Sequence, residues 1–334
     1  MTVLDQWGLA AVAESEWNVG AVRARVVRVD RGECDVMTEQ GQLRVLSDSQ
    51  RSQDELAPVT GDWVELSESE GLGWVIARIL PRRTQVSRRD PAERDVEQVL
   101  ASNVDVVAVV HGLDRPLPAG RLERLLVVAL QSGAQPLVVL TKADEGLSED
   151  GDTAEMIARA LAGSIPVVVT SVVTGRGLDE VIARVATGQT LALVGASGVG
   201  KSSLINALVG DEVLAVGEVR EGDAKGRHTT TARELIRLPD GGGLVLDTPG
   251  IRSIGLWEAE QALEMVFADL GRRTEQCRFR DCAHGREPDC ALRAAVAAGE
   301  VEQVRLDRFL SLVGELNAQQ EREEQRRWRT GNSD

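Results

Sequence analysis

The chain has 334 residues, a length that suits two or three domains and at least one sizeable hydrophobic core. Its 38 Lys and Arg face 53 Asp and Glu. The resulting formal net charge of −15 excludes a protein coated in positive charge, so any contact with nucleic acid has to be local. No apolar run reaches the ~18 residues of a membrane span, and the N-terminus lacks the basic start of a leader peptide. We therefore expect a cytoplasmic protein that binds neither membranes nor DNA.

Residues 18–88 contain short β-type segments separated by Gly and acidic turns, without any helical period. The segments are 21–29, 34–47, 61–69 and 73–80. Short strands at such spacing are typical of a small barrel or sandwich. Arg residues nearly balance the acids here, so this is the relatively basic end of an acidic chain.

From about residue 100 the pattern changes, because continuously apolar segments alternate with amphipathic ones. The apolar segments, which we expect to be buried parallel strands, are 103–110, 135–140, 164–171 and 190–196. The helices expected between them are 119–132, 152–163 and 177–186. This alternation predicts an α/β domain with a parallel sheet.

The end of the α/β region and the C-terminal part show different sequence patterns. A hairpin of 232–238 and 243–250 would close the sheet around a Gly-rich turn. Beyond Trp257 we expect helices, and the segment 301–330 keeps a helical period through Leu316 before it becomes almost entirely charged. Its end is therefore expected to be a solvated or partner-binding helix.

The sequence GASGVGKS, from Gly195 to Ser202, follows an apolar strand and precedes a helix, which is the context of a phosphate-binding loop. In such a loop, backbone N–H groups surround the phosphates, a Lys neutralises the β and γ oxygens, and a Ser hydroxyl ligates Mg²⁺. Lys201 and Ser202 would take the last two roles here. A glycine turn with a chance GKS is the alternative, and the strand and helix on either side disfavour it. The predicted phosphate-binding residues are Gly195, Ala196, Ser197, Gly198, Val199, Gly200, Lys201, Ser202 and Ser203.

Two further motifs downstream have the pattern of nucleotide-sensing switches. The sequence DTPG ends an apolar strand, so that the Asp247 carboxylate can hold Mg²⁺ through water and the Gly250 N–H can contact a γ-phosphate. Between this motif and the phosphate loop lies GRHTTT. Thr230 is the first choice to complete the Mg²⁺ shell, with Thr229 and Thr231 as alternatives.

The residues that would read the base lie upstream of the phosphate loop. TKAD follows the apolar strand 135–140, and a Thr-Ser pair that ends in Ser171 follows the next strand. A carboxylate accepts from guanine N1–H and the 2-amino group, which adenine does not offer, and such paired bonds reject the wrong base by ~10⁴ or more. TKAD alone could be a helix cap, but its Lys is one of only three in the chain. The predicted base-binding residues are Thr141, Lys142, Ala143, Asp144 and Ser171.

The order of the motifs along the chain is base, base, phosphate, switch, switch, whereas ordinary small GTPases begin with the phosphate loop. This is the order of a circular permutation, which a compact domain allows because its termini tend to lie close together. The new break falls directly after the DTPG switch. Whatever follows residue 255 is therefore attached to the element expected to respond to GTP hydrolysis.

A Cx4CxHx5C pattern follows in the C-terminal region. Three thiolates and one imidazole make a tetrahedral zinc site, and a closed set of four ligands indicates a structural rather than a catalytic ion. The alternative is a set of buried thiols beside a surface His. The predicted zinc ligands are Cys277, Cys282, His284 and Cys290.

A β domain, the sequences GASGVGKSS, GRHTTT and DTPG, and the Cys/His module in this order resemble the RsgA (YjeQ) family of bacterial ribosome-assembly GTPases. The resemblance implies an OB-fold β-barrel at 1–90, an α/β circularly permuted P-loop GTPase domain at 91–255 and a small α-helical zinc-binding domain at 256–334. It also implies hydrolysis of GTP to GDP and phosphate by a monomer that acts in late maturation of the small ribosomal subunit, with that subunit and its rRNA as partners. From the residues alone, an OB barrel could equally bind protein or oligosaccharide.

Two positions depart from common GTPase patterns. Thr141 stands where Asn is commoner, which removes an amide that braces the pocket, and Ile251 stands where many GTPases keep a glutamine that positions water. His228 is the best candidate to orient water, because a neutral imidazole can accept a hydrogen bond from it, although a structural or ribosome-contacting role is the alternative. We therefore predict His228, Lys201 and Thr230 as catalytic residues.

Two other functions are alternatives. One is a nucleotide-switched RNA-binding module with little intrinsic hydrolysis, and the complete set of phosphate and Mg²⁺ residues disfavours it. The other is a metabolic P-loop kinase. The sequence shows no site for a second substrate, and TKAD indicates guanine as the base.

Overall fold

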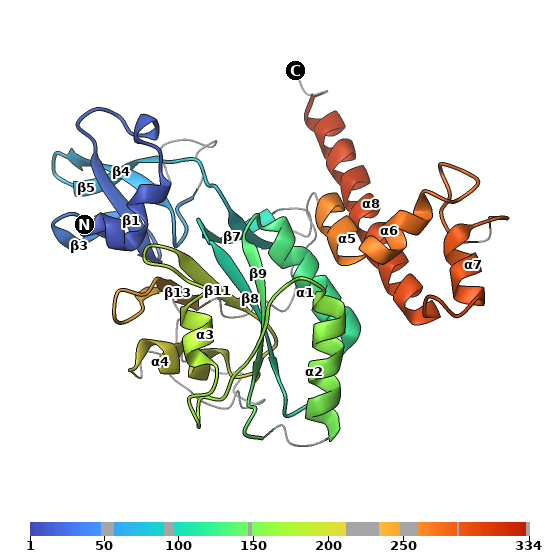
Figure 1. The fold of residues 1–334 in the computed structure, drawn as a ribbon. Coiled ribbons are helices and arrows are strands. Elements are labelled where there is room, and N and C mark those ends of the chain that lie inside the picture. Colours follow the sequence, from blue (N-terminus) through green and yellow to red (C-terminus); the bar gives the residue numbers. More distant parts are fainter. Residues whose placement is uncertain are drawn as a thin grey trace, which may run out of the picture.

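The computed structural model describes residues 1–47, 57–89, 97–145, 149–211, 234–247, 259–285 and 287–331. Figure 1 shows three parts in chain order: a β-barrel, an α/β body with a central sheet, and a group of C-terminal helices beside α1. Among the described residues, none of the helices combines the length and the apolar character that a membrane span needs.

The first part is a closed five-stranded barrel with the strand order β1-β2-β3-β5-β4. All its neighbouring pairs are antiparallel except β3 with β5. Apolar side chains alternate into its interior, as Val36 and Cys34 do on β2. The small barrel predicted from the sequence is confirmed and is OB-like. Its strands are β1 (Val22–Val29), β2 (Glu33–Thr38), β3 (Gly41–Leu46), β4 (Trp63–Ser69) and β5 (Gly73–Ile79).

Several short elements at the junction between barrel and α/β body were not predicted. The antiparallel pair β6 (Gln85–Arg89) and β7 (Glu97–Ser102) lies between the two parts, so the expected boundary at residues 90 and 91 falls between two paired strands. Ahead of β1 come the 3-10 helices η1 (Leu4–Trp7), η2 (Leu9–Ala11) and η3 (Glu14–Glu16). The first of them, η1, is anchored by the buried side chains of Leu4 and Trp7, apolar residues too isolated to give a periodic signal.

The α/β body has a six-stranded sheet with the order β10-β9-β8-β11-β13-β12, in which only β12 runs antiparallel. The predicted strands and their parallel arrangement are confirmed. The strands are β8 (Val106–Gly112), β9 (Gln135–Thr141), β10 (Val167–Val169), β11 (Thr190–Val194), β12 (Leu235–Arg237) and β13 (Leu244–Asp247). The helices are α1 (Ala119–Gln131), α2 (Glu149–Ala162), α3 (Leu178–Ile182) and α4 (Lys201–Val209), of which α3 is shorter than predicted.

Two hydrophobic cores cover the two faces of this sheet, and this explains why the sequences of its strands are continuously apolar. On β8, Val107 and Val109 belong to the core that also holds Leu122 and Leu126 of α1. The intervening side chains, including Ala108, belong to the core under α3 and α4. The strands are thereby fixed on both faces, and the loops at their ends are held in place.

The third part comprises α5 (Glu260–Val266), α6 (Ala268–Thr274), α7 (Ala291–Ala297) and α8 (Gln303–Gly331). The long charged helix predicted for the C-terminus is confirmed. Both α5 and α8 contact α1 of the α/β body. The carboxylate of Glu123 on α1 is completely buried there, with Arg305 and Arg308 of α8 at 2.6 and 2.7 Å.

A buried arginine connects the barrel to the sheet. Arg25 on β1 donates to the Thr190 hydroxyl at 2.8 Å, to the carbonyl oxygen of Asn103 at 3.2 Å and to the carbonyl oxygen of Trp7. Burial lowers the pKa of Arg25 to about 10, which still leaves the guanidinium charged at neutral pH. Because Thr190 begins β11, this contact ties the barrel to the strand that leads into the phosphate loop.

Candidate nucleotide site

The predicted site loops emerge at one edge of the sheet. The strands β8, β9, β10 and β11 are parallel, so the loops that follow them meet at their carboxyl ends. Successive strands β8, β9 and β10 are added in one direction, and β11 returns to the other side of β8. Ligands of open α/β sheets bind at such a reversal of strand order. The reversal between β8 and β11 is where the sequence GASGVGKS lies.

The loop from Gly195 to Gly200 connects β11 to the first residue of α4. Gly200 has a φ of +90°, a conformation that favours glycine. A Cβ at Gly195 would lie 2.4 Å from the carbonyl oxygen of Val110, so the loop passes directly over the end of β8. The ammonium of Lys201 donates to the carbonyl oxygens of Gly195 and Ala196 at 3.0 and 2.8 Å. The loop and the helix start therefore have the arrangement that binds anions.

The two predicted base loops are joined to each other. The Ser171 hydroxyl donates to the Asp144 carboxylate at 2.5 Å, and the Ala143 N–H donates to the carbonyl oxygen of Thr170 at 3.1 Å. Lys142 has a φ of +61°, which is uncommon for a residue with a Cβ and is found most often at functional sites. The structure thus brings together the carboxylate, the Lys and the Ser loop that the sequence assigned to one base pocket.

Thr141 connects the base loop to the phosphate loop. Its side chain is buried, and its hydroxyl donates to the carbonyl oxygen of Val199, with the His111 carbonyl oxygen at 3.3 Å. The sequence suggested that Thr at this position removes a brace. The hydroxyl supplies one nevertheless, because β9 ends close enough to the phosphate loop for a short side chain to reach it.

A third loop, after β8, carries charged residues that sequence reasoning missed. The Asp114 carboxylate accepts from Lys142 Nζ at 2.9 Å and from Arg115 Nη2 at 2.7 Å. These cations, Arg115 foremost, lower the pKa of Asp114 to about 2. Arg115 Nη2 also lies 3.4 Å from the carbonyl oxygen of Gly198 in the phosphate loop. The only signal for this loop in the sequence was its place at the carboxyl end of a buried strand.

His111 holds that third loop in place. It is buried at the end of β8, and its Nε2–H donates to the carbonyl oxygen of Arg115 at 3.2 Å. Burial lowers the pKa of His111, so the imidazole is neutral at pH 7. The structure thus gives this His a positioning contact.

The switch residues are only partly described. Asp247 ends β13 and pairs with Leu193 of β11, so its backbone lies next to the strand that enters the phosphate loop. The predicted residues His228, Thr230 and Gly250 lie outside the described residues.

The predicted zinc ligands converge in the C-terminal part. One ligand atom from each of Cys277, Cys282, His284 and Cys290 lies within 4.8 Å of all the others. His284 Nδ1 is 3.6 Å from Cys277 Sγ and 3.5 Å from Cys290 Sγ. Burial lowers the pKa of His284, which keeps the imidazole in the neutral form that a metal requires. Three sulfurs and one nitrogen at this spacing fit a tetrahedral Zn²⁺, because that ion prefers such donors.

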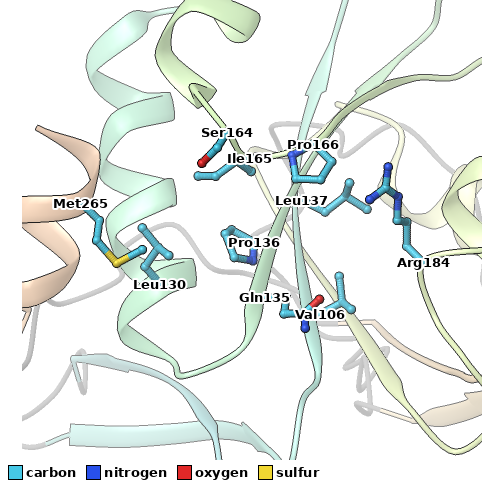
Figure 2. A pocket seen from close by; sticks show the side chains of 10 residues that line it. All are labelled: Val106, Leu130, Gln135, Pro136, Leu137, Ser164, Ile165, Pro166, Arg184 and Met265. Carbon is cyan, nitrogen blue, oxygen red and sulfur yellow. The ribbon is translucent and has the colours of Figure 1, made fainter. Parts of the chain in front are cut away.

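An apolar pocket of about 270 Å³ lies at the opposite edge of the sheet, where β8 and β9 begin. Figure 2 shows that Pro136, Ile165 and Met265 line it from the sheet, the segment before β10 and α5. Among the described residues that line it, Arg184 is the only charged one. With this lining and position, the pocket is not part of the nucleotide site.

Comparison with known proteins identifies the family. The family model described as RsgA GTPase matches residues 79–257, which include every loop of the candidate nucleotide site. The chain belongs to the RsgA GTPase family. It is accordingly a GTP hydrolase.

Full-length relatives agree with this assignment. The "Small ribosomal subunit biogenesis GTPase RsgA" of Streptomyces avermitilis is 45% identical over 300 residues, which cover 89% of this chain and 80% of the relative. The protein of the same name from Leptospira interrogans is 38% identical over 304 residues, covering 90% and 84%. The similarity thus extends well beyond the residues of the family model.

Solved structures share the fold. YjeQ from Thermotoga maritima matches with a TM-score of 0.61 at 28% identity, over 88% of this chain and 98% of that one. YloQ, described as a circularly permuted GTPase, matches with a TM-score of 0.59 at 24% identity, over 92% and 98%. The strand order found here, with the base loops ahead of the phosphate loop, is that of a permuted G domain.

Proposed function

We propose that this chain is a cytoplasmic RsgA GTPase that binds the small ribosomal subunit and assists its late maturation, hydrolysing GTP to time its own release or that of another factor. The name shared by the relatives from Streptomyces avermitilis and Leptospira interrogans supports this partner. The identities of 45% and 38% extend over 89% and 90% of this chain, so the parts outside the G domain are shared as well.

The observation that supports guanine recognition best is the hydrogen bond between Ser171 and Asp144. It orients a carboxylate at the edge of the sheet where the phosphate loop also begins. Asp144 would accept from guanine N1–H and the 2-amino group, and the stem of Lys142 would lie on the ring face. Thr141 and Ala143 would hold this loop through their contacts with Val199 and Thr170.

The phosphate and Mg²⁺ roles follow from the loop geometry. Residues 195–203 would surround the phosphates, with Lys201 neutralising the β and γ oxygens. Ser202, Thr230 and Asp247 would hold Mg²⁺ directly or through water, as GTP hydrolysis in this family requires the ion. His228 would orient the attacking water, since Ile251 cannot. Gly250 would contact the γ-phosphate through its N–H.

The division into domains remains part of the proposal. We assign 1–90 to an OB-fold domain, 91–255 to the permuted G domain and 256–334 to a zinc-binding domain of a monomer. Structural Zn²⁺ would supply the folding energy of the last unit. Support comes from the closed barrel, the parallel sheet and the convergent Cys₃His cluster.

The zinc domain and the barrel would contact rRNA through local positive charge. The Arg-rich stretch around the zinc ligands is partly neutralised, because Arg273 pairs with Glu300 and Arg278 with Asp289. Arg278 also lies 5.6 Å from the centre of the Phe279 ring, and both side chains are exposed. Exposed guanidinium and aromatic groups suit phosphate and base contacts.

Binding to purified ribosomal subunits tests this proposal. The full chain would be sedimented with small subunits in the presence of a non-hydrolysable GTP analogue, GDP or no nucleotide, with large subunits as the control. We expect the analogue to increase the bound fraction by ~10-fold over GDP, an ordinary size for a nucleotide-driven coupling. Equal binding to both subunits, or binding that ignores the nucleotide, would contradict the proposal.

A nucleotide-switched RNA-binding module with little hydrolysis is the remaining alternative. It would give the same sedimentation result but little turnover of GTP on the subunit. The presence of Lys201, Ser202 and Asp247 in their expected places in the sequence favours the hydrolase.

A further inference from the structure

The loop after β8 lies between the base loop and the phosphate loop and touches both. Asp114 contacts Lys142 of the base loop at 2.9 Å, and Arg115 contacts the Gly198 carbonyl oxygen of the phosphate loop at 3.4 Å. Asp114 and Arg115 are joined to each other by two hydrogen bonds, at 2.7 and 3.0 Å. A continuous chain of polar contacts therefore runs from the base lysine to the phosphate loop.

Two hydrogen bonds anchor the backbone of the loop after β8. The Leu113 N–H donates to the carbonyl oxygen of Thr141 at 2.9 Å, and the buried His111 ring donates to the carbonyl oxygen of Arg115 at 3.2 Å. Each of these hydrogen bonds links the loop to the end of β8 or β9. The two hydrophobic cores pack against both faces of these strands. The position of the Asp114 carboxylate is thus set by the sheet.

The close packing around Gly112 is a second indication that the position of the Asp114 carboxylate is fixed. A Cβ at Gly112 would lie 2.4 Å from Asp114 Oδ1 and 3.5 Å from Lys142 Cδ. The backbone of Gly112, the carboxylate and the lysine stem are therefore packed against one another. Any side chain at residue 112 has to displace the Asp114 carboxylate.

We propose that Asp114 and Arg115 are positioning residues of the nucleotide site, which join its base half to its phosphate half. Asp114 holds the Lys142 ammonium so that the lysine stem is ready to lie on the guanine ring. Arg115 shares the same carboxylate and restrains the phosphate loop at Gly198. Both residues hold the site in its binding conformation before the nucleotide arrives, so less conformational entropy is lost on binding and the affinity for GTP and GDP is higher. Neither residue takes part in the hydrolytic step. The inference rests on the proposed function, because it concerns the same site.

The decisive experiment is a double-mutant cycle on GDP affinity, measured with a fluorescent GDP analogue and the full chain. Asp114→Asn keeps the shape but removes the charge, and Lys142→Met removes the ammonium but keeps the stem. We expect Asp114→Asn to weaken binding by about tenfold, since a charge-assisted pair contributes roughly 1.5 kcal/mol. In the Lys142→Met background the same change should have a clearly smaller effect, because the lysine partner is already gone and only the pair with Arg115 remains to be lost.

Four further variants separate positioning from folding. Gly112→Ala should weaken GDP binding to a similar extent without removing any charge. Arg115→Ala should weaken it, and Arg115→Lys should restore only part of the affinity, because an ammonium lacks the planar fork that binds a carboxylate at two points. Asp105→Asn removes another carboxylate charge ahead of β8, where it pairs with Arg83 at 3.3 Å, and the Asn oxygen can still accept from the Thr190 N–H, so affinity should stay within about twofold. In turnover assays the Asp114 and Arg115 variants should raise KM with kcat nearly unchanged.

The outcomes distinguish this inference from the proposed function. If the unaltered chain fails to bind the GDP analogue, both are overturned. If it binds, and Asp114→Asn is equally damaging with or without Lys142 and with or without Arg115, the carboxylate acts through the fold and the positioning role is wrong. Unchanged affinity in Asp114→Asn and Arg115→Ala would also overturn the inference while leaving the GTPase assignment intact.

Discussion

The hydroxyl of Thr141, at the end of β9, donates a hydrogen bond to the carbonyl oxygen of Val199 in the phosphate loop, 58 residues further along the chain. The two residues stand on opposite sides of the circular permutation, yet the parallel sheet places their loops side by side. A Cβ added at Gly200 would lie only 3.4 Å from the same hydroxyl oxygen. The base loop and the phosphate loop are therefore braced against each other.

We predict that Thr141→Val weakens GTP and GDP binding by about 5- to 30-fold. The substitution keeps the shape of the side chain but leaves the Val199 carbonyl oxygen without its donor, which costs roughly 1–2 kcal/mol. Titration with a fluorescent guanine nucleotide measures the effect.

Thr170→Val is the matched control, because the Thr170 hydroxyl is also buried but donates to the Leu140 carbonyl oxygen rather than to the phosphate loop. It should lower the unfolding free energy about as much while affinity stays within about twofold. If both variants bind guanine nucleotides equally well, the brace has no role in binding.

Asp144→Asn should change the base preference. The Asn amide places a donor where guanine also presents donors, so GTP affinity should fall by at least ~10²-fold, whereas xanthosine triphosphate binding should improve. Competition between the two nucleotides measures the switch. A loss of both affinities together would instead indicate that Asp144 only supports the loop through Ser171.

His228→Ala should lower kcat by ~10² or more with a nearly unchanged KM for GTP, the pattern of an interaction made in the transition state. Lys201→Ala should behave differently and impair nucleotide binding itself. Steady-state turnover in the presence of small subunits measures both. Unchanged turnover of His228→Ala would assign that His to a structural or ribosome-contacting role.

Cys282→Ser should release the zinc predicted at one ion per chain and unfold the surrounding module locally, while GTP binding persists. Metal analysis and hydrogen exchange measure the two effects. Cys34→Ser is the control, since Cys34 is a buried thiol of the barrel outside the cluster and its loss should leave the metal in place. Purified protein without zinc, or full zinc in Cys282→Ser, would contradict the assignment.

Glu123→Ala should loosen the C-terminal helices from the α/β body. The substitution leaves the guanidinium groups of Arg305 and Arg308 without the buried carboxylate between them, and we expect a loss of about 2 kcal/mol or more. Glu315→Gln on the same interface breaks a partly exposed pair with Arg124 and should cost about 1 kcal/mol or less. Hydrogen exchange of α8 measures the loss of stability in both variants. Equal losses would contradict the argument that the buried pair contributes more than the partly exposed pair.

Much of the fold followed from periodicity. The strands β8 to β11 are continuously apolar because two cores cover them, and β2 of the barrel alternates because only one of its faces is buried. The pairing of β6 with β7 and the helix η1 gave no such signal, since they are short and depend on contacts with residues distant in sequence. The buried Arg25 was equally invisible, because a lone Arg in a strand normally indicates an exposed face.

The site was predictable where a short sequence carries its own geometry, as in GASGVGKS, TKAD and the Cys₃His cluster. Asp114 and Arg115 belong to no such motif, and only the adjacency of β8, β9 and β11 brings them beside Lys142 and Gly198. The contact of α1 with α8 was missed for the same reason. It gives the C-terminal helices a second attachment besides the covalent link after β13.

The central claim, a guanine-specific GTPase that works on the small ribosomal subunit, is tested most directly by turnover. Phosphate release from GTP and from ATP would be measured for the purified full chain, alone and with small subunits, using large subunits as the control. We predict that small subunits raise GTP turnover by at least ~10-fold, as completion of a GTPase site by a partner can do, while ATP turnover stays at background. Equal turnover of ATP and GTP, or GTP turnover that small subunits leave unchanged, would contradict the claim.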